Sequence, residues 1–199
     1  DWSSDVCSSD LRKLASILPP DGLLVANADD ADVMEHASLA RCRVATYGVR
    51  AGDWRPVKVA ADASGTSLEL TKCEGRFCLP MWGEHNLSNA TGIIAMLCES
   101  GVGPEKIAAG LPLFKGVKRR QEIVADVKGV VVIDDFAHHP TAVAKTIESM
   151  RTRFPGRRLW AIFEPRSNTS RRNIFQKDFE EALSGADRAL IASPFRRES

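Results

Sequence analysis

The sequence predicts an α/β protein in two parts. Short apolar runs that end in polar residues alternate with stretches whose apolar residues recur every three or four positions, the patterns of strands and helices. This alternation favours a parallel, doubly wound sheet. The 199 residues, 44% of them hydrophobic and 27% charged, are enough to bury the core of one large or two small globular domains.

Charge, hydropathy and cysteine content narrow the class of protein. Lys and Arg number 27 against 26 Asp and Glu, so no global field attracts nucleic acid or an anionic membrane. No stretch of about 18 apolar residues predicts a membrane span, and the start of the chain does not resemble a signal peptide. The five cysteines lack the paired spacing of a zinc site, which favours reduced thiols in a cytoplasmic protein.

The two ends of the chain read differently from the rest. Residues 1–10 (DWSSDVCSSD) resemble translated adapter sequence, so we treat them as a non-native leader. The chain stops at residues 194–199, directly after an apparent strand. Together these observations predict a fragment of a longer protein.

The first part, residues 11–113, combines two patterns. A strand–helix–strand unit comes first, and a period-two alternation then predicts a β-hairpin before two further helices. We expect Val33, Met34, Ala37 and Leu39 on the buried side of the first helix. The elements expected are strands at 22–27, 44–48, 57–62, 67–71 and 76–79, and helices at 30–40, 83–99 and 104–110.

The second part, residues 114–199, follows a boundary at about 112–116. Lys128 and Gly129 predict a tight turn between two strands, and Val143, Ile147 and Met150 predict the buried face of the next helix. Strands then alternate with helices, as in a doubly wound domain. The elements expected are strands at 122–127, 130–135, 159–163 and 188–192, and helices at 141–154 and 173–184.

Asn86 and Asn89 lie three residues apart at the start of the helix expected at 83–99, so we expect them to share a helix face. Two amides on one face offer donors and acceptors that suit a purine edge or a ribose. Helix capping is the alternative, because Asn and Ser are frequent in first turns.

A cationic segment, Lys115 to Arg120, lies beside the domain boundary. Guanidinium groups suit phosphate because they present several N–H donors in a fixed plane. This makes the segment a candidate phosphate contact. A solvated, charged linker is the alternative.

The segment DDFAHHPTA, residues 134–142, follows the strand expected at 130–135. Ligands of open α/β sheets bind beyond the carboxyl ends of the strands, where a carboxylate such as that of Asp135 can accept hydrogen bonds from a ribose. One alternative is a metal site at Asp135 and His138, although no further cluster completes a coordination shell. The other is a purely structural turn.

A second loop after a strand, residues 163–172 (FEPRSNTSRR), is dense in hydrogen-bond donors. Such a loop suits an anionic substrate. A solvated connection between a strand and a helix is the alternative.

These segments, in this order and spacing, resemble the Mur ligase family over about residues 11–196. NLSNA (86–90) resembles the asparagine helix of that family, GVKRR (116–120) its interdomain arginine segment, and DDFAHHPT (134–141) the start of its C-terminal domain. Within the family, DDFAHHPTA and FEPRSNT (163–169) point to the branch that joins a recycled murein tripeptide to UDP-N-acetylmuramate. The alanine-adding branch is the alternative.

The resemblance implies the C-terminal portion of a central ATPase domain followed by a Rossmann-like C-terminal domain, each incomplete. It further implies a cytoplasmic, monomeric ligase that uses ATP and Mg²⁺ and proceeds through an acyl phosphate, with no role for nucleic acid or a membrane. The resemblance does not imply that residues of this chain bind a metal.

Residue roles also follow from the resemblance. Asn86 and Asn89 are expected to contact the adenine, Arg120 the ATP phosphates, and Asp135 the ribose. Arg120 and His138 are the candidate catalytic residues. The peptide side of the site is expected to involve His138, Arg166, Ser167 and Asn168.

The chain departs from the family pattern at its start. The phosphate loop, the magnesium-binding acids and the UDP-binding domain lie upstream of residue 11 in that pattern, and no G-x-x-x-x-G-K-[ST] motif occurs here. We therefore expect the 199-residue chain to lack ligase activity. Two other hypotheses remain: a non-catalytic nucleotide-binding module, and a metal-dependent hydrolase that uses Asp134, Asp135, His138 and His139.

Overall fold

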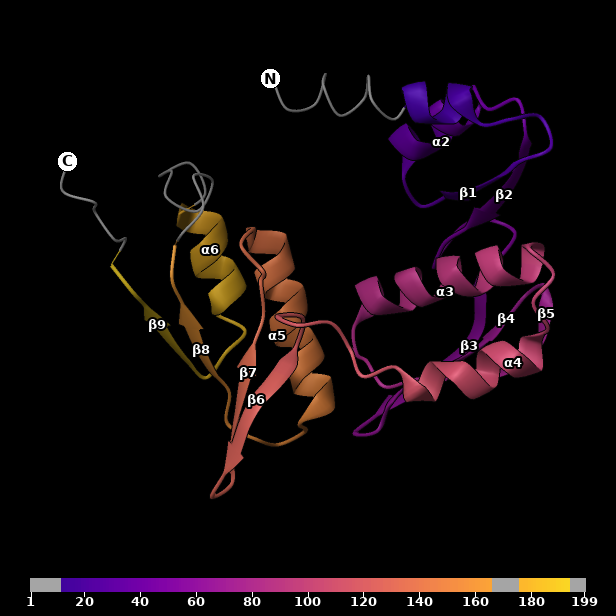
Figure 1. The fold of residues 1–199 in the computed structure, drawn as a ribbon. Coiled ribbons are helices and arrows are strands. Elements are labelled where there is room, and N and C mark those ends of the chain that lie inside the picture. Colours follow the sequence, from indigo (N-terminus) through magenta and orange to yellow (C-terminus); the bar gives the residue numbers. More distant parts are fainter. Residues whose placement is uncertain (1–11, 166–175, 194–199) are drawn as a thin grey trace. The chain divides into compact units, whose positions relative to one another are not determined.

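The computed structural model describes residues 12–165 and 176–193 (Figure 1). The described residues divide into two compact units. The first contains the chain up to Ala60 together with Thr66–Leu79 and Glu84–Phe114. The second contains Ala61–Gly65, Pro80–Gly83 and the residues from Lys115 onward.

The first unit opens with the expected strand–helix–strand arrangement. After a helical stretch at residues 12–17, β1 (Leu23–Asn27) pairs in parallel with β2 (Arg43–Tyr47), and α2 (Ala31–Ala37) connects them. Asp30 caps α2, because its side chain accepts hydrogen bonds from the backbone N–H groups of Asp32 and Val33. The cap explains why the helix begins directly after the acidic pair that follows β1.

The prediction of the buried face of α2 is only partly correct. Ala37 is buried, but Val33 and Met34 are half-buried and the side chain of Leu39 is 49% exposed. The helix ends at Ala37, so Leu39 lies beyond it. The helical spacing that predicted a buried Leu39 therefore does not apply to that residue. His36 is buried instead.

A three-stranded sheet follows in the order β3–β4–β5, formed by β3 (Pro56–Asp62), β4 (Gly65–Leu70) and β5 (Cys73–Leu79). β5 begins three residues earlier than the pattern predicts, and it pairs antiparallel with β4 with a register shift between Leu68 and Leu70. The expected hairpin is therefore part of a larger antiparallel element.

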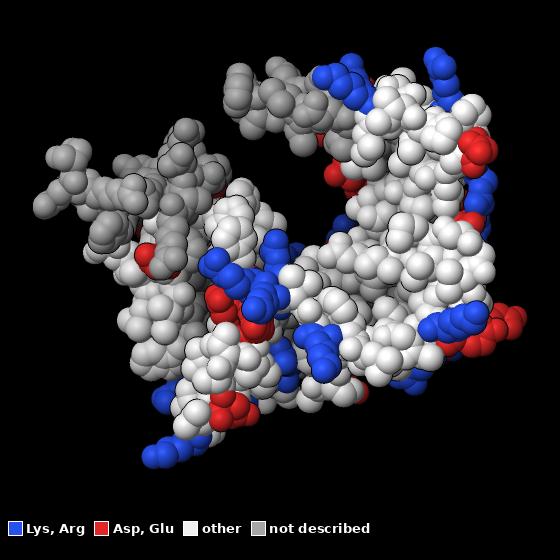
Figure 2. Space-filling model, viewed as in Figure 1, with Lys and Arg blue, Asp and Glu red and all other residues white. Residues whose placement is uncertain are grey.

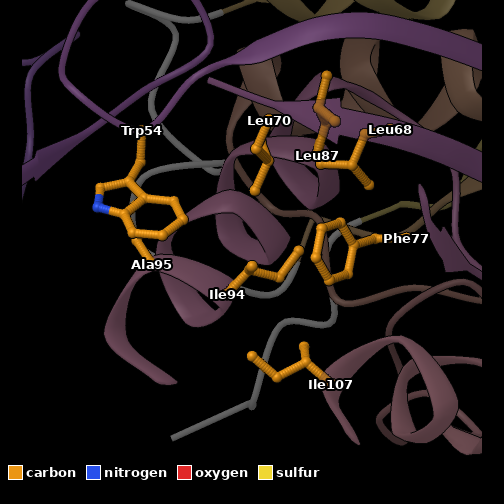
Figure 3. Close-up of a cluster of buried hydrophobic side chains, with 8 residues drawn as sticks. All are labelled: Trp54, Leu68, Leu70, Phe77, Leu87, Ile94, Ala95 and Ile107. Atoms are coloured by element: carbon orange, nitrogen blue, oxygen red, sulfur yellow. The ribbon is translucent and has the colours of Figure 1, made fainter. Parts of the chain in front are cut away.

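Two helices follow: α3 (Glu84–Glu99), which contacts β1 and β2, and α4 (Pro104–Gly110), which contacts β5 and is followed by the 3₁₀ turn η1 (Leu111–Leu113). The core of the unit lies where both helices meet the sheet (Figure 3). Ile93 of α3 is 48% exposed, because the neighbouring Ile94 takes the core position. The core residues are Trp54, Leu68, Leu70, Phe77, Leu87, Ile94, Ala95 and Ile107.

The second unit opens with the antiparallel hairpin of β6 (Glu122–Val127) and β7 (Val130–Asp134). Lys128 and Gly129 have φ values of 50° and 79°, and positive φ at both central residues is what a tight primed hairpin turn requires. The sequence therefore predicted both the strands and the turn.

Helix α5 (Pro140–Arg153), β8 (Trp160–Phe163), α6 (Gln176–Leu183) and β9 (Arg188–Ile191) complete the second unit as described. β8 and β9 pair in parallel, as expected for strands joined by a helix. The buried positions of α5 are those predicted, since Val143, Ile147 and Met150 are all buried. The core cluster consists of Val143, Ile147, Phe179, Ala182 and Leu183.

The parallel sheets of this chain are two-stranded pieces within the described residues, β1–β2 in one unit and β8–β9 in the other. None of the helices in the described ranges is long and apolar enough to cross a bilayer. On the face drawn in Figure 2, basic and acidic side chains are interspersed, which agrees with the net charge of +1.

Candidate functional site

The carboxyl end of β1 delivers an acid that organises the neighbouring loop. The Asp29 carboxylate accepts hydrogen bonds from the backbone N–H groups of Val49 at 2.6 Å, Ala51 at 2.8 Å and Arg50 at 3.1 Å. A Cβ atom on Gly48 would lie 2.8 Å from Asp29 Oδ1 and 2.6 Å from the Ala51 carbonyl, so only glycine fits this approach. Asp29 therefore holds the loop after β2 in one conformation.

Burial of Asp29 raises the pKa of its carboxyl, but the hydrogen bonds from Val49, Ala51 and Arg50 and the charge of Arg50 outweigh that effect, and the pKa lies below its usual value of 3.8. The carboxylate is thus held in its ionised form. The sequence motif Asp29-Asp30 after a strand was the signal that could have identified it.

The same loop contacts the first turn of α3. Arg50 forms an ion pair with Glu84 at 2.7 Å, between side chains that are 71% and 42% exposed. Asn86 is buried, with 7% of its surface exposed, whereas Asn89 is exposed. The two asparagines therefore differ in access to solvent although they lie one turn apart.

Tyr47, the last residue of β2, packs against the same helix. A Cβ atom on Gly92 would lie 2.8 Å from two atoms of the Tyr47 ring, so the ring lies directly on the helix backbone. Burial, and to a lesser extent the charge of Asp29, raises the pKa of the Tyr47 hydroxyl. The strand end, the loop and α3 thus form one continuous edge of the first unit.

The arginine segment of the second unit is a strained turn. Arg119 and Gln121 have φ values of 58° and 53°, in the left-handed region that side chains other than glycine rarely adopt. The Arg119 N–H donates to Glu122 Oε2 at 2.8 Å, and its guanidinium pairs with Asp134 Oδ2 at 3.5 Å. Arg120, between the two left-handed residues, is exposed.

Asp135 joins this turn to the end of β7. Its Oδ2 accepts from the Gln121 N–H at 2.9 Å, and its Oδ1 accepts from the Ala137 N–H at 2.8 Å and from the Thr146 hydroxyl at 3.3 Å. The carboxylate is therefore part of the local turn structure. Each carboxylate oxygen has two lone pairs, so Oδ2 retains the capacity to accept a further donor.

Phe136 strengthens the same junction. Its N–H donates to the Arg119 carbonyl at 2.8 Å, and the Arg119 guanidinium lies 4.9 Å from the centre of its ring. The structure thus brings two predicted site residues, Arg120 and Asp135, onto adjoining segments of one unit.

Gln121 is a buried polar residue of this turn that the sequence analysis did not single out. Its side chain is 7% exposed, yet neither its Oε1 nor its Nε2 has a hydrogen-bond partner among the described residues. Its backbone carbonyl accepts from Arg153 Nη1 at 3.1 Å. A buried amide without partners costs about 1–3 kcal/mol, so this residue lowers the stability of the turn.

The two histidines of DDFAHHPTA have different surroundings. His138 is exposed, its Nδ1 lies 2.9 Å from the Phe136 carbonyl, and its ring lies 5.0 Å from that of Phe136. His139 caps α5, because its side chain accepts from the Thr141 N–H at 3.4 Å. His139 thus has a structural role at the helix start, whereas the His138 ring lies at the surface.

The remaining predicted residues, Arg166, Ser167 and Asn168, lie outside the described residues. Within the described ranges, no group of three or more His, Cys, Asp and Glu side chains lies close enough together to hold a metal ion. The hydrolase hypothesis therefore receives no support from the geometry of Asp134, Asp135, His138 and His139.

Two protein-family models match the chain. Residues 9–97 match the Mur ligase middle domain, and residues 119–199 match the Mur ligase glutamate ligase domain. Among curated proteins, the UDP-N-acetylmuramate–L-alanine ligase of Clostridium acetobutylicum is 33% identical over 192 residues, which cover 94% of this chain and 42% of that protein.

Solved structures show the same fold. The UDP-N-acetylmuramate–alanine ligase of Thermotoga maritima matches with a TM-score of 0.80 at 23% identity, over 98% of this chain and 43% of that chain. The murein peptide ligase of Psychrobacter arcticus matches with a TM-score of 0.61 at 30% identity, over 94% and 40%. The chain spans less than half the length of these relatives.

Proposed function

The chain belongs to the Mur ligase family through its middle and C-terminal domains, and on that premise we propose that it is part of an ATP-dependent ligase. The enzyme would join an amine to the lactyl carboxyl group of UDP-N-acetylmuramate in the cytoplasm. The oxygen of that carboxylate attacks the γ-phosphorus of ATP, and ADP leaves. The amine then attacks the acyl carbon of the resulting acyl phosphate, and inorganic phosphate leaves as the amide bond forms.

The hydrogen bond between Asp135 and Gln121 is the observation that carries this proposal. It ties the arginine segment to the acid at the strand end, so that the Arg120 guanidinium and the Asp135 carboxylate belong to one local structure. Phosphoryl transfer depends on charge neutralisation and positioning more than on covalent groups. We assign Arg120 to the phosphates and the free lone pair of Asp135 Oδ2 to a ribose hydroxyl.

We assign the contacts with the base to residues of the first unit. Asn89 is exposed and can donate to and accept from an adenine edge, whereas the buried Asn86 shapes the helix surface beneath it. Mg²⁺ would accompany ATP, and since no described cluster of side chains fits it, we assign it no residue of this chain. His138, exposed beside Phe136, is assigned to the amine side.

Two amines are candidates. The alanine ligase of Clostridium acetobutylicum, 33% identical, favours free L-alanine. The segment DDFAHHPTA and the 30% identity with the murein peptide ligase of Psychrobacter arcticus favour a murein tripeptide. The comparisons support L-alanine better than the tripeptide that the motifs predicted, because the curated relatives similar to the chain carry that name.

Nucleotide binding tests the residue assignments directly. Titration of the 199-residue chain with ATP in a calorimeter should detect binding, and Arg120→Ala and Asp135→Ala should each weaken it by roughly tenfold or more, as expected for the loss of a charged hydrogen bond. Asp126→Ala, an exposed acid on β6, is the matched control and should bind as the parent does. Equal affinity in all variants would refute the assignments.

The full-length parent protein tests the reaction. Supplied with ATP, Mg²⁺, UDP-N-acetylmuramate and equal concentrations of L-alanine and tripeptide, it should form one amide product, identified by its mass. Dominance of the tripeptide product would overturn the preference for L-alanine. Hydrolysis of ATP without either product would overturn the ligase proposal itself.

A further inference from the structure

Two thiols of the first unit lie in contact, although they are far apart in the sequence. The Sγ atoms of Cys73 and Cys98 are 3.9 Å apart. Cys73 opens β5, Cys98 lies in the last turn of α3, and both side chains are half-buried against the core cluster. Cys98 lies 12 residues after Asn86, or about 18 Å along the helix axis at 1.5 Å per residue. The pair is therefore distinct from the candidate nucleotide site.

We propose that Cys73 and Cys98 form a thiol-oxidation site, whose product is a disulfide that joins β5 to the end of α3. A disulfide requires an S–S distance of about 2.05 Å. The Sγ atoms are 3.9 Å apart, so the two side chains have to approach each other by roughly 2 Å for the bond to form.

The two sulfurs have different roles in the reaction. Burial, together with the hydrogen bond to Cys73, raises the pKa of the Cys98 thiol to about 11, so Cys98 keeps its proton at neutral pH. The Cys73 sulfur gives up its proton and attacks one oxygen of a peroxide such as H₂O₂; the O–O bond breaks, the leaving hydroxide takes up that proton as water, and a sulfenic acid forms. The Cys98 sulfur then attacks the Cys73 sulfur, and the sulfenic oxygen leaves as water with the thiol proton. Two thiols and one H₂O₂ thus give one disulfide and two waters.

The position of the pair determines what the bond does. Glu99, the next residue after Cys98, accepts from Trp54 Nε1 at 2.8 Å, pairs with Arg43 and lies 4.0 Å from Lys72 Nζ. These polar contacts already hold the end of α3 to the strands. The disulfide reinforces the same junction covalently and links residues 25 positions apart, which restricts the unfolded chain.

Oxidation of the intact 199-residue chain tests the proposal. Treatment of the reduced protein with a small excess of H₂O₂ should lower the number of free thiols from five to three. Peptide mass spectrometry should identify a linked peptide pair that contains Cys73 and Cys98. The melting temperature of the first unit should rise by roughly 5–15 °C, and dithiothreitol should reverse the rise.

Variants separate this pair from the other thiols. Cys73→Ser and Cys98→Ser should each abolish the linked peptide and the shift in melting temperature. Cys78→Ser removes an exposed thiol from the same strand and is the matched control, which should behave as the parent does. A linked peptide that uses Cys42 or Cys78, or free thiols that persist at Cys73 and Cys98 while Cys78 is oxidised, would overturn the proposal. Peptide mapping of the unaltered chain tests the proposal even if a variant fails to fold. It also does not depend on nucleotide binding.

Discussion

The carboxylate of Asp135 accepts a hydrogen bond from the backbone N–H of Gln121, with 2.9 Å between oxygen and nitrogen. Residue 121 directly follows Arg120, and residue 135 directly follows the strand β7. This contact, together with the hydrogen bond from the Phe136 N–H to the Arg119 carbonyl, holds the arginine turn against the strand end. Gln121 adopts a left-handed conformation, which costs about 1 kcal/mol or more, so the turn depends on such contacts.

Asp135→Ala should destabilise the second unit by about 1–3 kcal/mol. The substitution leaves the N–H groups of Gln121 and Ala137 without their acceptor, and the strain at Gln121 is then no longer offset. Urea unfolding measures the loss. Amide hydrogen exchange at residues 121 and 137 should accelerate selectively. Exchange at these two amides that is unchanged in the variant would contradict the structural role of Asp135.

Gln121→Met should leave the second unit equally stable or make it more stable by up to about 1–3 kcal/mol. Methionine has nearly the same shape, and it removes two buried polar atoms that have no partner among the described residues. The midpoint of urea unfolding is the measurement. A clear loss of stability in the variant would show that the side-chain amide of Gln121 makes a stabilising contact.

Asp29→Asn should destabilise the first unit at neutral pH by about 1 kcal/mol, a modest value because Asp29 is exposed to solvent. The pKa of Asp29 is lowered in the folded state, so its contribution is complete above the usual value of 3.8 and is lost as the pH falls through the folded-state value. The difference between parent and variant should therefore vanish in acid. Asp21→Asn, also exposed, is the control. A difference that persists unchanged in acid would count against the role of the carboxylate charge.

Gly92→Ala should destabilise the first unit by about 1–3 kcal/mol, although the same change in most helices is stabilising. The added methyl group would lie 2.8 Å from the Tyr47 ring, which cannot move without disturbing the strand end. Gly110→Ala, at a position with nothing within 4 Å, is the matched control and should be neutral or slightly stabilising. Thermal unfolding of both variants is the measurement. Equal melting temperatures would refute the close packing of the Tyr47 ring against Gly92.

Local patterns predicted most of the elements. The alternation of Glu122 to Val127 and Val130 to Asp134 around a Lys-Gly turn gave a hairpin at the expected residues, because strand period and turn geometry are properties of neighbouring residues. The same reasoning was wrong for Leu39, which is 49% exposed. Which face of a short helix meets a core depends on where the helix ends and what packs against it.

The site was only partly predictable for the same reason. Spacing placed Asn86 and Asn89 on one helix, but not that the first is buried and the second exposed. The acid Asp135 was identified from its position after a strand, but not its hydrogen bonds to the turn that contains Arg120. Asp29 and Gln121 were missed because their environments are formed by residues far from them in the sequence.

The order and type of the elements, the α/β class and the segments that resemble a known family could be predicted from residue patterns, since these depend on periodicity, turn residues and short motifs. The folded structure was needed to find that Asp29 holds the loop of Val49 to Ala51 and that the sulfurs of Cys73 and Cys98 meet. Such contacts join residues 20 or more positions apart. They form because core packing brings distant segments of the chain together. A local sequence pattern does not specify which distant segments meet.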